Sequence, residues 1–159
     1  MKDILKALIE QDEKIIDDYF LSLEEILFKK ERIKYHRNRQ WHKDSMIPAK
    51  EGVYIIFKEN IPLYVGETAC LYLRMKDIYD TRNHTIRRRI AEIECSKNDG
   101  YIKPSSRNLS DDKTEAIITK FMERMEIAYL ELKLGRIEFE DYLMEKYQPK
   151  YNKKTKRKM

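Results

Sequence analysis

The chain has 159 residues, of which 42% are apolar and 38% charged, with a net charge of +5. This length fits one domain with room for an added element, and it can bury a core without metals or disulfides. Its two cysteines, Cys70 and Cys95, have no metal or redox spacing, which fits a reduced, cytoplasmic setting better than a secreted disulfide scaffold. No apolar run reaches membrane-spanning length and no signal-peptide core is present, so we expect no membrane association.

Charge is unevenly distributed in the first part of the chain. Residues 1–28 carry eight acidic and three basic side chains, whereas residues 29–43 carry seven Lys and Arg against one Glu. Residues 3–28 also place apolar side chains at near-helical spacing, which predicts one long amphipathic helix or two shorter ones. The apolar stripe must pack on the rest of the domain or on a second copy, so a homodimer through this helix is one of two alternatives.

Basic residues in three segments are candidates for nucleic-acid binding. Segment 29–43 mixes cations with Tyr35, Trp41 and two histidines, a combination that can neutralise phosphates and stack on bases, or can equally form a solvated helix surface. A second basic cluster follows at 82–89 and a third at 153–158. The residues that we predict to contact nucleic acid are Lys34, Arg37, Arg39, Arg87, Arg88, Lys153 and Lys154.

Residues 52–66, with the sequence GVYIIFKENIPLYVG, predict a β-hairpin. Two alternating apolar segments flank a break that contains Asn60 and Pro62. A register with Ile56 opposite Tyr64 would place Tyr54 and Tyr64 on one face as near neighbours. Aromatic residues are good strand formers, so on the hairpin alone strand propensity explains the two tyrosines better than a site does.

The remaining chain predicts an α+β domain. Helices are expected at about 70–80 and 84–95, followed by a polar loop at 96–110 and a helix at 111–124 capped by Ser110. A strand at 126–132 precedes a helix at 137–147, which Pro149 ends. This order predicts a small antiparallel sheet flanked by helices. We divide the chain into a helical extension (1–49), the α+β domain (50–152) and a basic tail (153–159).

Two charged residues lie on helix faces that are otherwise apolar. At 100° per residue, Arg74 falls at the edge of the apolar arc of the 70–80 helix, and Glu140 falls inside the arc of the 137–147 helix. A charge in such a position is either paired structurally or held for chemistry. With the two hairpin tyrosines, these residues suit phosphodiester hydrolysis: a carboxylate for a divalent cation, a guanidinium for transition-state charge and a phenol for water.

These residues resemble the signatures of the GIY-YIG nuclease superfamily. GVY at 52–54 and YVG at 64–66 match its two name-giving motifs, and Arg74 follows at the expected distance. EDYLMEKYQPKYN at 140–152 matches a later segment of the family pattern, which begins with a glutamate and ends with an asparagine. The resemblance covers about residues 50–152, and it implies a three-stranded antiparallel sheet flanked by helices and metal-dependent hydrolysis of DNA.

Carried over by position, the resemblance also implies a role for each matching residue. Glu140 would bind Mg²⁺ or Mn²⁺, and Arg74 would contact the scissile phosphate. Tyr54 and Tyr64 would orient or activate water. Structural support would come from Gly52, Gly66 and Asn152. The expected substrate is double-stranded DNA, cut to leave a 5′-phosphate and a 3′-hydroxyl.

The chain departs from the family pattern at one position. Many members carry His or Tyr four residues after the arginine, where this chain has Ile78. Tyr79 or His84 could take over that catalytic role, and His84 could equally begin a helix or contact phosphate, so the identity of the general base stays open. The length favours a compact, stand-alone restriction- or phage-type nuclease; the alternatives are a catalytically silent nucleic-acid-binding module and a nuclease subunit of a larger assembly.

Overall fold

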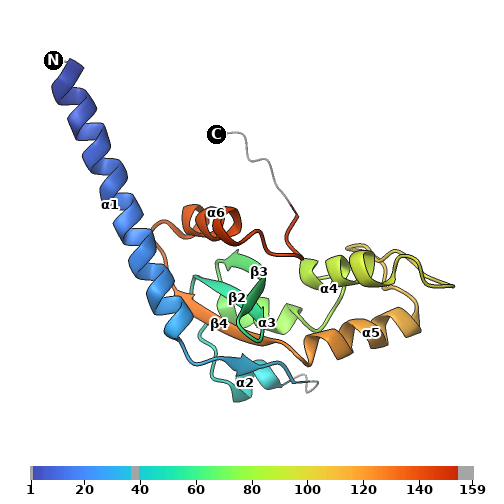
Figure 1. The fold of residues 1–159 in the computed structure, drawn as a ribbon. Helices are drawn as coiled ribbons and strands as arrows, with labels where there is room; N and C mark the ends of the chain where they lie inside the picture. Colours follow the sequence, from blue (N-terminus) through green and yellow to red (C-terminus); the bar gives the residue numbers. More distant parts are fainter. Residues whose placement is uncertain (1, 37–39, 154–159) are drawn as a thin grey trace.

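Four strands form one antiparallel sheet in the order β1-β4-β2-β3 (Figure 1). The computed structural model describes residues 2–36 and 40–153. The inner strand β2 (Gly52–Lys58) pairs with β3 (Ile61–Thr68) and with β4 (Glu126–Glu131). The two-residue β1 (Ile33–Lys34) pairs with β4 and makes four strands where the sequence predicted three. A strand of two residues is too short to show a period, which is why the pattern missed it.

The β2–β3 hairpin has the predicted register. Ile56 pairs with Tyr64, and Tyr54 pairs with Gly66. The register shifts after Ile56, which is the signature of a β-bulge, and the chain then turns through Glu59, whose φ is 56°. Tyr54 and Tyr64 consequently share one face of the sheet, as the alternation of side chains requires.

Both faces of β2 are covered, so residues 52–57 are all buried. Val53, Ile55 and Phe57 face a core formed with α1 (Lys2–Lys29) and α6 (Arg136–Tyr147). Tyr54 and Ile56 face a second core. That core is built with α3 (Leu71–Asp77), α4 (Thr85–Ile90), the π-helix η1 (Ala91–Cys95) and α5 (Asp112–Met122). The domain therefore has two helical layers around a mostly buried sheet.

The described residues of segment 29–43, which are 29–36 and 40–43, do not form a solvated helix surface. The segment supplies β1 and the short helix α2 (Trp41–Asp44), and the side chains of Tyr35, Trp41 and His42 are buried. Tyr35 and Trp41 pack against each other with ring centroids 5.9 Å apart. The aromatic residues that the sequence offered for base stacking are therefore part of the core that includes Tyr54.

The start of α5 differs from the prediction by one residue. Asp111, rather than Ser110, is the N-cap, and its carboxylate accepts a hydrogen bond from the Thr114 amide at 2.9 Å. The Ser110 hydroxyl instead donates to the Ile102 carbonyl and holds the preceding loop. Either residue type can cap a helix, so the sequence pattern could not distinguish them.

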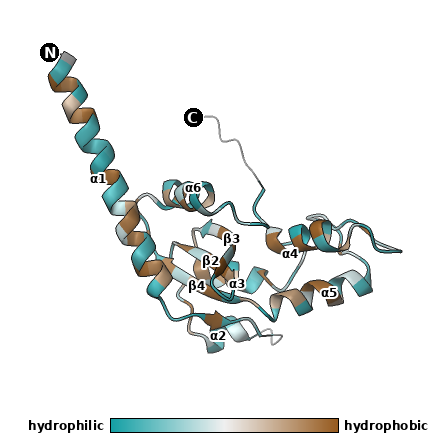
Figure 2. Ribbon diagram, in the orientation of Figure 1, coloured by the Kyte–Doolittle hydropathy of each residue, from teal (hydrophilic) through white to brown (hydrophobic). Residues whose placement is uncertain are grey.

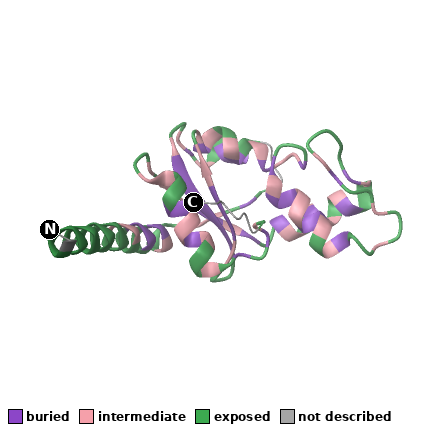
Figure 3. Cartoon of the chain, turned by 90° about the horizontal axis from the view of Figure 1, so that it is seen from above, coloured by how far each residue is buried: buried purple, intermediate pink, exposed green. Residues whose placement is uncertain are grey.

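The N-terminal amphipathic segment is one helix, and only its second half packs on the domain. Leu23 and Leu27 are buried in the core with α6, whereas the apolar residues of the first half are exposed (Figure 3). Hydrophobic residues nevertheless recur along the whole of α1 (Figure 2). The exposed large apolar residues between residues 4 and 16 are Ile4, Leu5, Leu8, Ile9, Ile15 and Ile16. No helix among the described residues is long and apolar enough to span a membrane.

Glu24 joins α1 to α6 through a buried hydrogen-bond network. Its carboxylate accepts bonds from the Tyr142 hydroxyl at 2.7 Å, from Lys146 Nζ at 2.9 Å and from the Tyr147 hydroxyl. Burial by itself would raise the pKa of Glu24, but these three donors outweigh it and the pKa is lowered. The packing of Phe20 on Phe139 and Tyr142, with centroids 5.8 and 5.3 Å apart, adds to the same contact.

We expect Glu24→Gln to lower the free energy of unfolding by about 1–3 kcal/mol, because it leaves buried donors imperfectly paired. The loss should be full at neutral pH and vanish as pH falls through the lowered folded-state pKa, because the wild-type carboxylate is then protonated as well. Urea unfolding at several pH values measures this. Glu25→Gln, at an exposed neighbouring position, is the control and should change little; equal effects of the two variants would contradict the prediction.

Candidate active site

Tyr54 lies at the centre of the candidate site. Its side chain is fully buried on β2, and its hydroxyl oxygen accepts a hydrogen bond from Arg74 Nε at 3.2 Å. His84 Nε2 lies 3.0 Å from the same oxygen. The aromatic ring passes directly over Gly66, where any Cβ atom would overlap the ring and its hydroxyl. The glycine of the second motif therefore makes room for the tyrosine of the first.

Tyr64 is the outer of the two phenols. Its ring centroid lies 6.1 Å from that of Tyr54 and 5.6 Å from that of His84, and its side chain reaches the surface slightly, at 6% exposure. Burial raises the pKa of Tyr64, the charge and hydrogen bond of Arg74 lower it, and the negative charge of Glu140 raises it. The net effect is a raised pKa, so at neutral pH the resting phenol is protonated.

Arg74 links the two phenols. It lies half-buried on α3, and its Nη1 donates to the carbonyl of Asn83 at 3.1 Å. Burial alone would lower its pKa, but the two phenols favour the charged form and the pKa is raised. The guanidinium is therefore permanently charged, and its hydrogen bond to the Asn83 carbonyl joins α3 to the loop before α4. No sequence pattern could have pointed to Asn83, because its contribution is a backbone carbonyl.

His84, and not Tyr79, joins this group. His84 is the N-cap of α4, and its Nδ1 accepts a hydrogen bond from the Ile86 amide at 3.2 Å. Burial lowers the pKa of His84 well below the usual value, and the cations of Arg74 and nearby arginines lower it further. Tyr79 instead packs on Tyr35 and donates its hydroxyl to the backbone. Ile78, at the position where the family often has His or Tyr, is buried in the core.

Glu140 lies on α6 with only 9% of its surface exposed. Its charge acts on Tyr64, which stands on β3, the edge strand that α6 contacts. No group of three or more His, Cys, Asp or Glu side chains that could enclose a metal occurs in the part of the chain that the structure describes. A single carboxylate nevertheless fits Mg²⁺, which keeps several waters and binds through one or two carboxylates together with substrate phosphate.

Asn152 and Gly52 support the strands that carry the phenols. The Asn152 amide donates to the Val65 carbonyl and accepts from the Val65 amide, both at 2.8 Å, and so fastens the chain after α6 to β3. A Cβ atom on Gly52 would overlap the Leu130 carbonyl of the neighbouring strand and the side chain of Leu71. The structure thus brings Tyr54, Tyr64, Arg74 and His84 together. The charge of Glu140 acts on Tyr64. The supporting residues Gly52, Gly66 and Asn152 lie on or beside the strands that carry the phenols.

Residues 50–152 of the chain match the sequence model of one protein family, the GIY-YIG catalytic domain. The protein belongs to the GIY-YIG nuclease family. The curated sequences include no significant match. Similar solved structures include the GIY-YIG N-terminal endonuclease domain of UvrC from Thermotoga maritima. A point mutant bound to its catalytic divalent cation is 20% identical, with a TM-score of 0.43, over 71% of this chain and 96% of that one. The magnesium-bound form is 19% identical, with a TM-score of 0.40, over 70% and 96%.

The basic residues predicted to bind nucleic acid do not all lie on the surface of this GIY-YIG protein. Arg87 is buried at 3% exposure, which leaves little of its side chain for the predicted contact with nucleic acid. Its side chain is bonded to Thr81, Tyr35, Glu115 and Thr119. Arg88 is half-buried and donates to the carbonyls of Thr81 and Arg82. Lys34 and Lys153 are exposed. Arg37, Arg39 and Lys154 lie outside the described residues.

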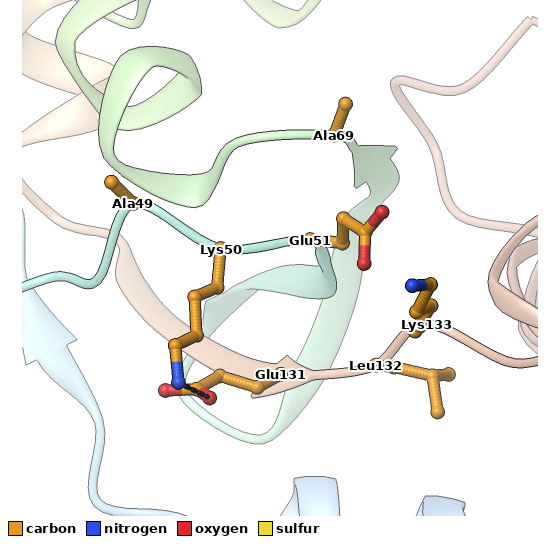
Figure 4. Close-up of a pocket in the computed structure, with 7 residues that line it drawn as sticks. All are labelled: Ala49, Lys50, Glu51, Ala69, Glu131, Leu132 and Lys133. Atoms are coloured by element: carbon orange, nitrogen blue, oxygen red, sulfur yellow. Dashed lines mark ion pairs between the residues drawn. The ribbon is translucent and has the colours of Figure 1, made fainter.

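A pocket of about 480 Å³ borders the start of β2, and no residue of the two GIY-YIG motifs lines it (Figure 4). It opens where β2 begins and β4 ends, and Ala69 lines it after β3. Lys50 and Glu131 form an ion pair at 3.6 Å on its wall, and Glu51 and Lys133 also line it. None of the predicted site residues lines this pocket, and its charged groups are balanced in sign, so it offers no preference for phosphate.

We expect Arg87→Met to lower the free energy of unfolding by about 3 kcal/mol, because Glu115 would lose its buried cation and the two threonines their donor. Lys153→Met removes an equal charge from the exposed chain after α6 and should change stability by less than about 0.5 kcal/mol. Denaturant unfolding of both variants measures the difference. If the Arg87→Met protein were as stable as wild type but bound DNA more weakly, Arg87 would instead be a DNA-contacting residue.

Proposed function

We propose that this protein is a metal-dependent DNA endonuclease that cuts phosphodiester bonds to leave a 5′-phosphate and a 3′-hydroxyl. The observation that carries the proposal is the hydrogen bond from Arg74 to Tyr54, made beside Tyr64 and within the electrostatic range of Glu140. A fixed cation, two phenols and a partly buried carboxylate together provide the groups that phosphodiester hydrolysis needs. Membership of the GIY-YIG family supports the same reaction class.

The geometry supports a separate role for each side chain. Arg74 is charged, and as a planar guanidinium it suits a phosphate oxygen. Tyr64 is the phenol closest to solvent, so it is the one that can orient the attacking water and accept its proton once nearby cations lower its pKa. Glu140 would hold the divalent cation, Mg²⁺ or Mn²⁺, which supplies positive charge for the phosphate and the leaving oxygen when bound.

Double-stranded DNA is the proposed substrate. The net charge of +5 favours a polyanion, and the exposed Lys34 and Lys153 can neutralise phosphates. Lys153 directly follows Asn152, which is bonded to β3, so it lies on the chain that borders the strand of Tyr64. A cytoplasmic location, as the cysteine usage predicts, gives access to such a substrate.

We expect purified protein to nick or linearise plasmid DNA when Mg²⁺ or Mn²⁺ is present and not after chelation. Glu140→Gln should lower the rate by about a hundredfold or more, because the cation loses its charged ligand. Glu138→Gln, on the same helix but exposed, is the matched control and should cut normally. Nicks should be resealed by DNA ligase without further treatment, which requires the two proposed ends.

Two results would contradict this function. Cleavage that is equal in wild type and Glu140→Gln would indicate a contaminating nuclease. No cleavage of plasmid, branched or single-stranded DNA with either metal, together with tighter DNA binding by Glu140→Gln, would favour a silent binding module in which the carboxylate only repels phosphate.

We also propose that two copies associate through the first half of α1. Leu8 and Ile15 are 53% and 59% exposed, and at 100° per residue they lie on the arc that continues to the buried Leu23. The apolar face that packs on the domain therefore continues beyond the domain, with no described element covering it. A second copy offers an identical stripe, and a symmetric pair would cover both.

Light scattering after size-exclusion chromatography tests this association. We expect about twice the 19.4 kDa chain mass for wild type. The double substitution Leu8→Glu and Ile15→Glu should give the single-chain mass, because it places charge on the stripe. Glu13→Lys, which changes an exposed polar position, should keep the larger mass. A wild-type protein of single-chain mass at all concentrations would rule out the pair.

A further inference from the structure

The hydrogen bonds of His84 fix which of its ring nitrogens carries a proton. Nδ1 lies 3.2 Å from the backbone amide nitrogen of Ile86, as the N-cap of α4. A backbone N–H can only donate, so Nδ1 must present its lone pair. In a neutral imidazole the other nitrogen then carries the hydrogen, and Nε2 is a donor.

The other two protonation states of His84 do not fit these contacts. An imidazolium carries hydrogens on both nitrogens, and the Ile86 amide would then face a donor. A ring with no hydrogen would be an anion, which a fully buried site does not sustain at neutral pH. The fully buried ring lies near the cations of Arg74, Arg87 and Arg88, and this surrounding opposes a further positive charge.

The neutral Nε2–H form determines the direction of the Tyr54 hydroxyl. The Tyr54 oxygen has two acceptor sites, and it receives Arg74 Nε at 3.2 Å and His84 Nε2 at 3.0 Å. With both sites used, its own hydrogen must point in a third direction. Tyr64 is the neighbouring phenol, with ring centroids 6.1 Å apart. Its interaction with Tyr54 raises the pKa of Tyr54 and lowers that of Tyr64, as expected when the Tyr54 hydroxyl donates.

We propose that His84 is a positioning residue, locked as the Nε2–H tautomer by the N-cap of α4, which directs the Tyr54 hydroxyl toward Tyr64. His84 has no lone pair facing the site, so it is not the general base. Instead, its Nε2–H donates to the Tyr54 hydroxyl oxygen and holds that hydroxyl in one orientation. In this orientation the Tyr54 hydroxyl donates its own hydrogen to Tyr64. The consequence for cleavage rests on the proposed function, whereas the tautomer itself does not.

Nitrogen NMR of protein labelled at histidine tests the tautomer without any cleavage assay. The chain has three histidines, and His84→Asn identifies the signals of His84 by their loss. We expect Nδ1 of His84 to give the signal of an unprotonated ring nitrogen and Nε2 that of a protonated one. This pattern should persist on both sides of pH 6.5, around which an ordinary histidine titrates. A protonated Nδ1, or an ordinary titration, would overturn the proposal.

Two substitutions separate the cap from the donor. His84→Asn keeps an oxygen near the position of Nδ1 and remains a good N-cap, but it cannot reach Tyr54. His84→Gln places an amide nitrogen near the position of Nε2 and can donate to Tyr54, but it weakens the cap. A purely structural role would make Asn the better replacement, and a positioning role would make Gln the better one.

We expect His84→Asn to reduce kcat by about ten- to a hundredfold with KM unchanged, because Tyr54 and Tyr64 lose their alignment. His84→Gln should recover most of this rate even if it is the less stable of the two proteins. Recovery by Asn and not by Gln would overturn the positioning role. If wild type cuts no substrate, the proposed nuclease function fails, and the NMR result still supports or overturns the tautomer.

Discussion

The oxygen atom of Tyr54 is the point on which the site depends. It has no access to water, so its hydrogen-bonding capacity must be met by protein groups. Arg74 from α3 and His84 from the start of α4 meet it, and Gly66 on β3 leaves the space through which the ring passes. One buried phenol thereby sets the residue type at three other positions on three different elements.

The sequence was sufficient for the parts of this arrangement that follow from periodicity. Alternation in the hairpin predicted the pairing of Ile56 with Tyr64, and helical projection predicted the burial of Glu140. The partners of Arg87 could not be predicted in the same way. Glu115 and Thr119 lie 28 and 32 residues further along the chain, and a run of three arginines looks the same whether its members face solvent or the core. The role of His84 likewise depends on the Ile86 amide and the Tyr54 hydroxyl beside its ring, and helical or strand periodicity does not predict those contacts.

The N-terminal helix extends beyond the residues that match the GIY-YIG family, yet it is joined to the helix that carries Glu140. Glu24 binds three side chains of α6, and Phe20 packs on Phe139, the residue before Glu140. The sheet supports α6 from one side and α1 supports it from another. The second half of α1 is therefore part of the framework that positions Glu140, the candidate metal ligand. The exposed first half of α1 lies outside this framework.

Arg74 shows what this framework achieves before any substrate binds. A long, flexible side chain loses about 2 kcal/mol of rotamer entropy when it is fixed in one conformation. Arg74 is already fixed by Tyr54 and by the Asn83 carbonyl in the folded protein. That entropy is lost during folding, so it need not be lost again when a phosphate arrives. A lysine at this position would keep the charge but would lack the planar fork whose separate nitrogens bind Tyr54 and the Asn83 carbonyl. Its more flexible side chain would then lose more entropy at each encounter with substrate.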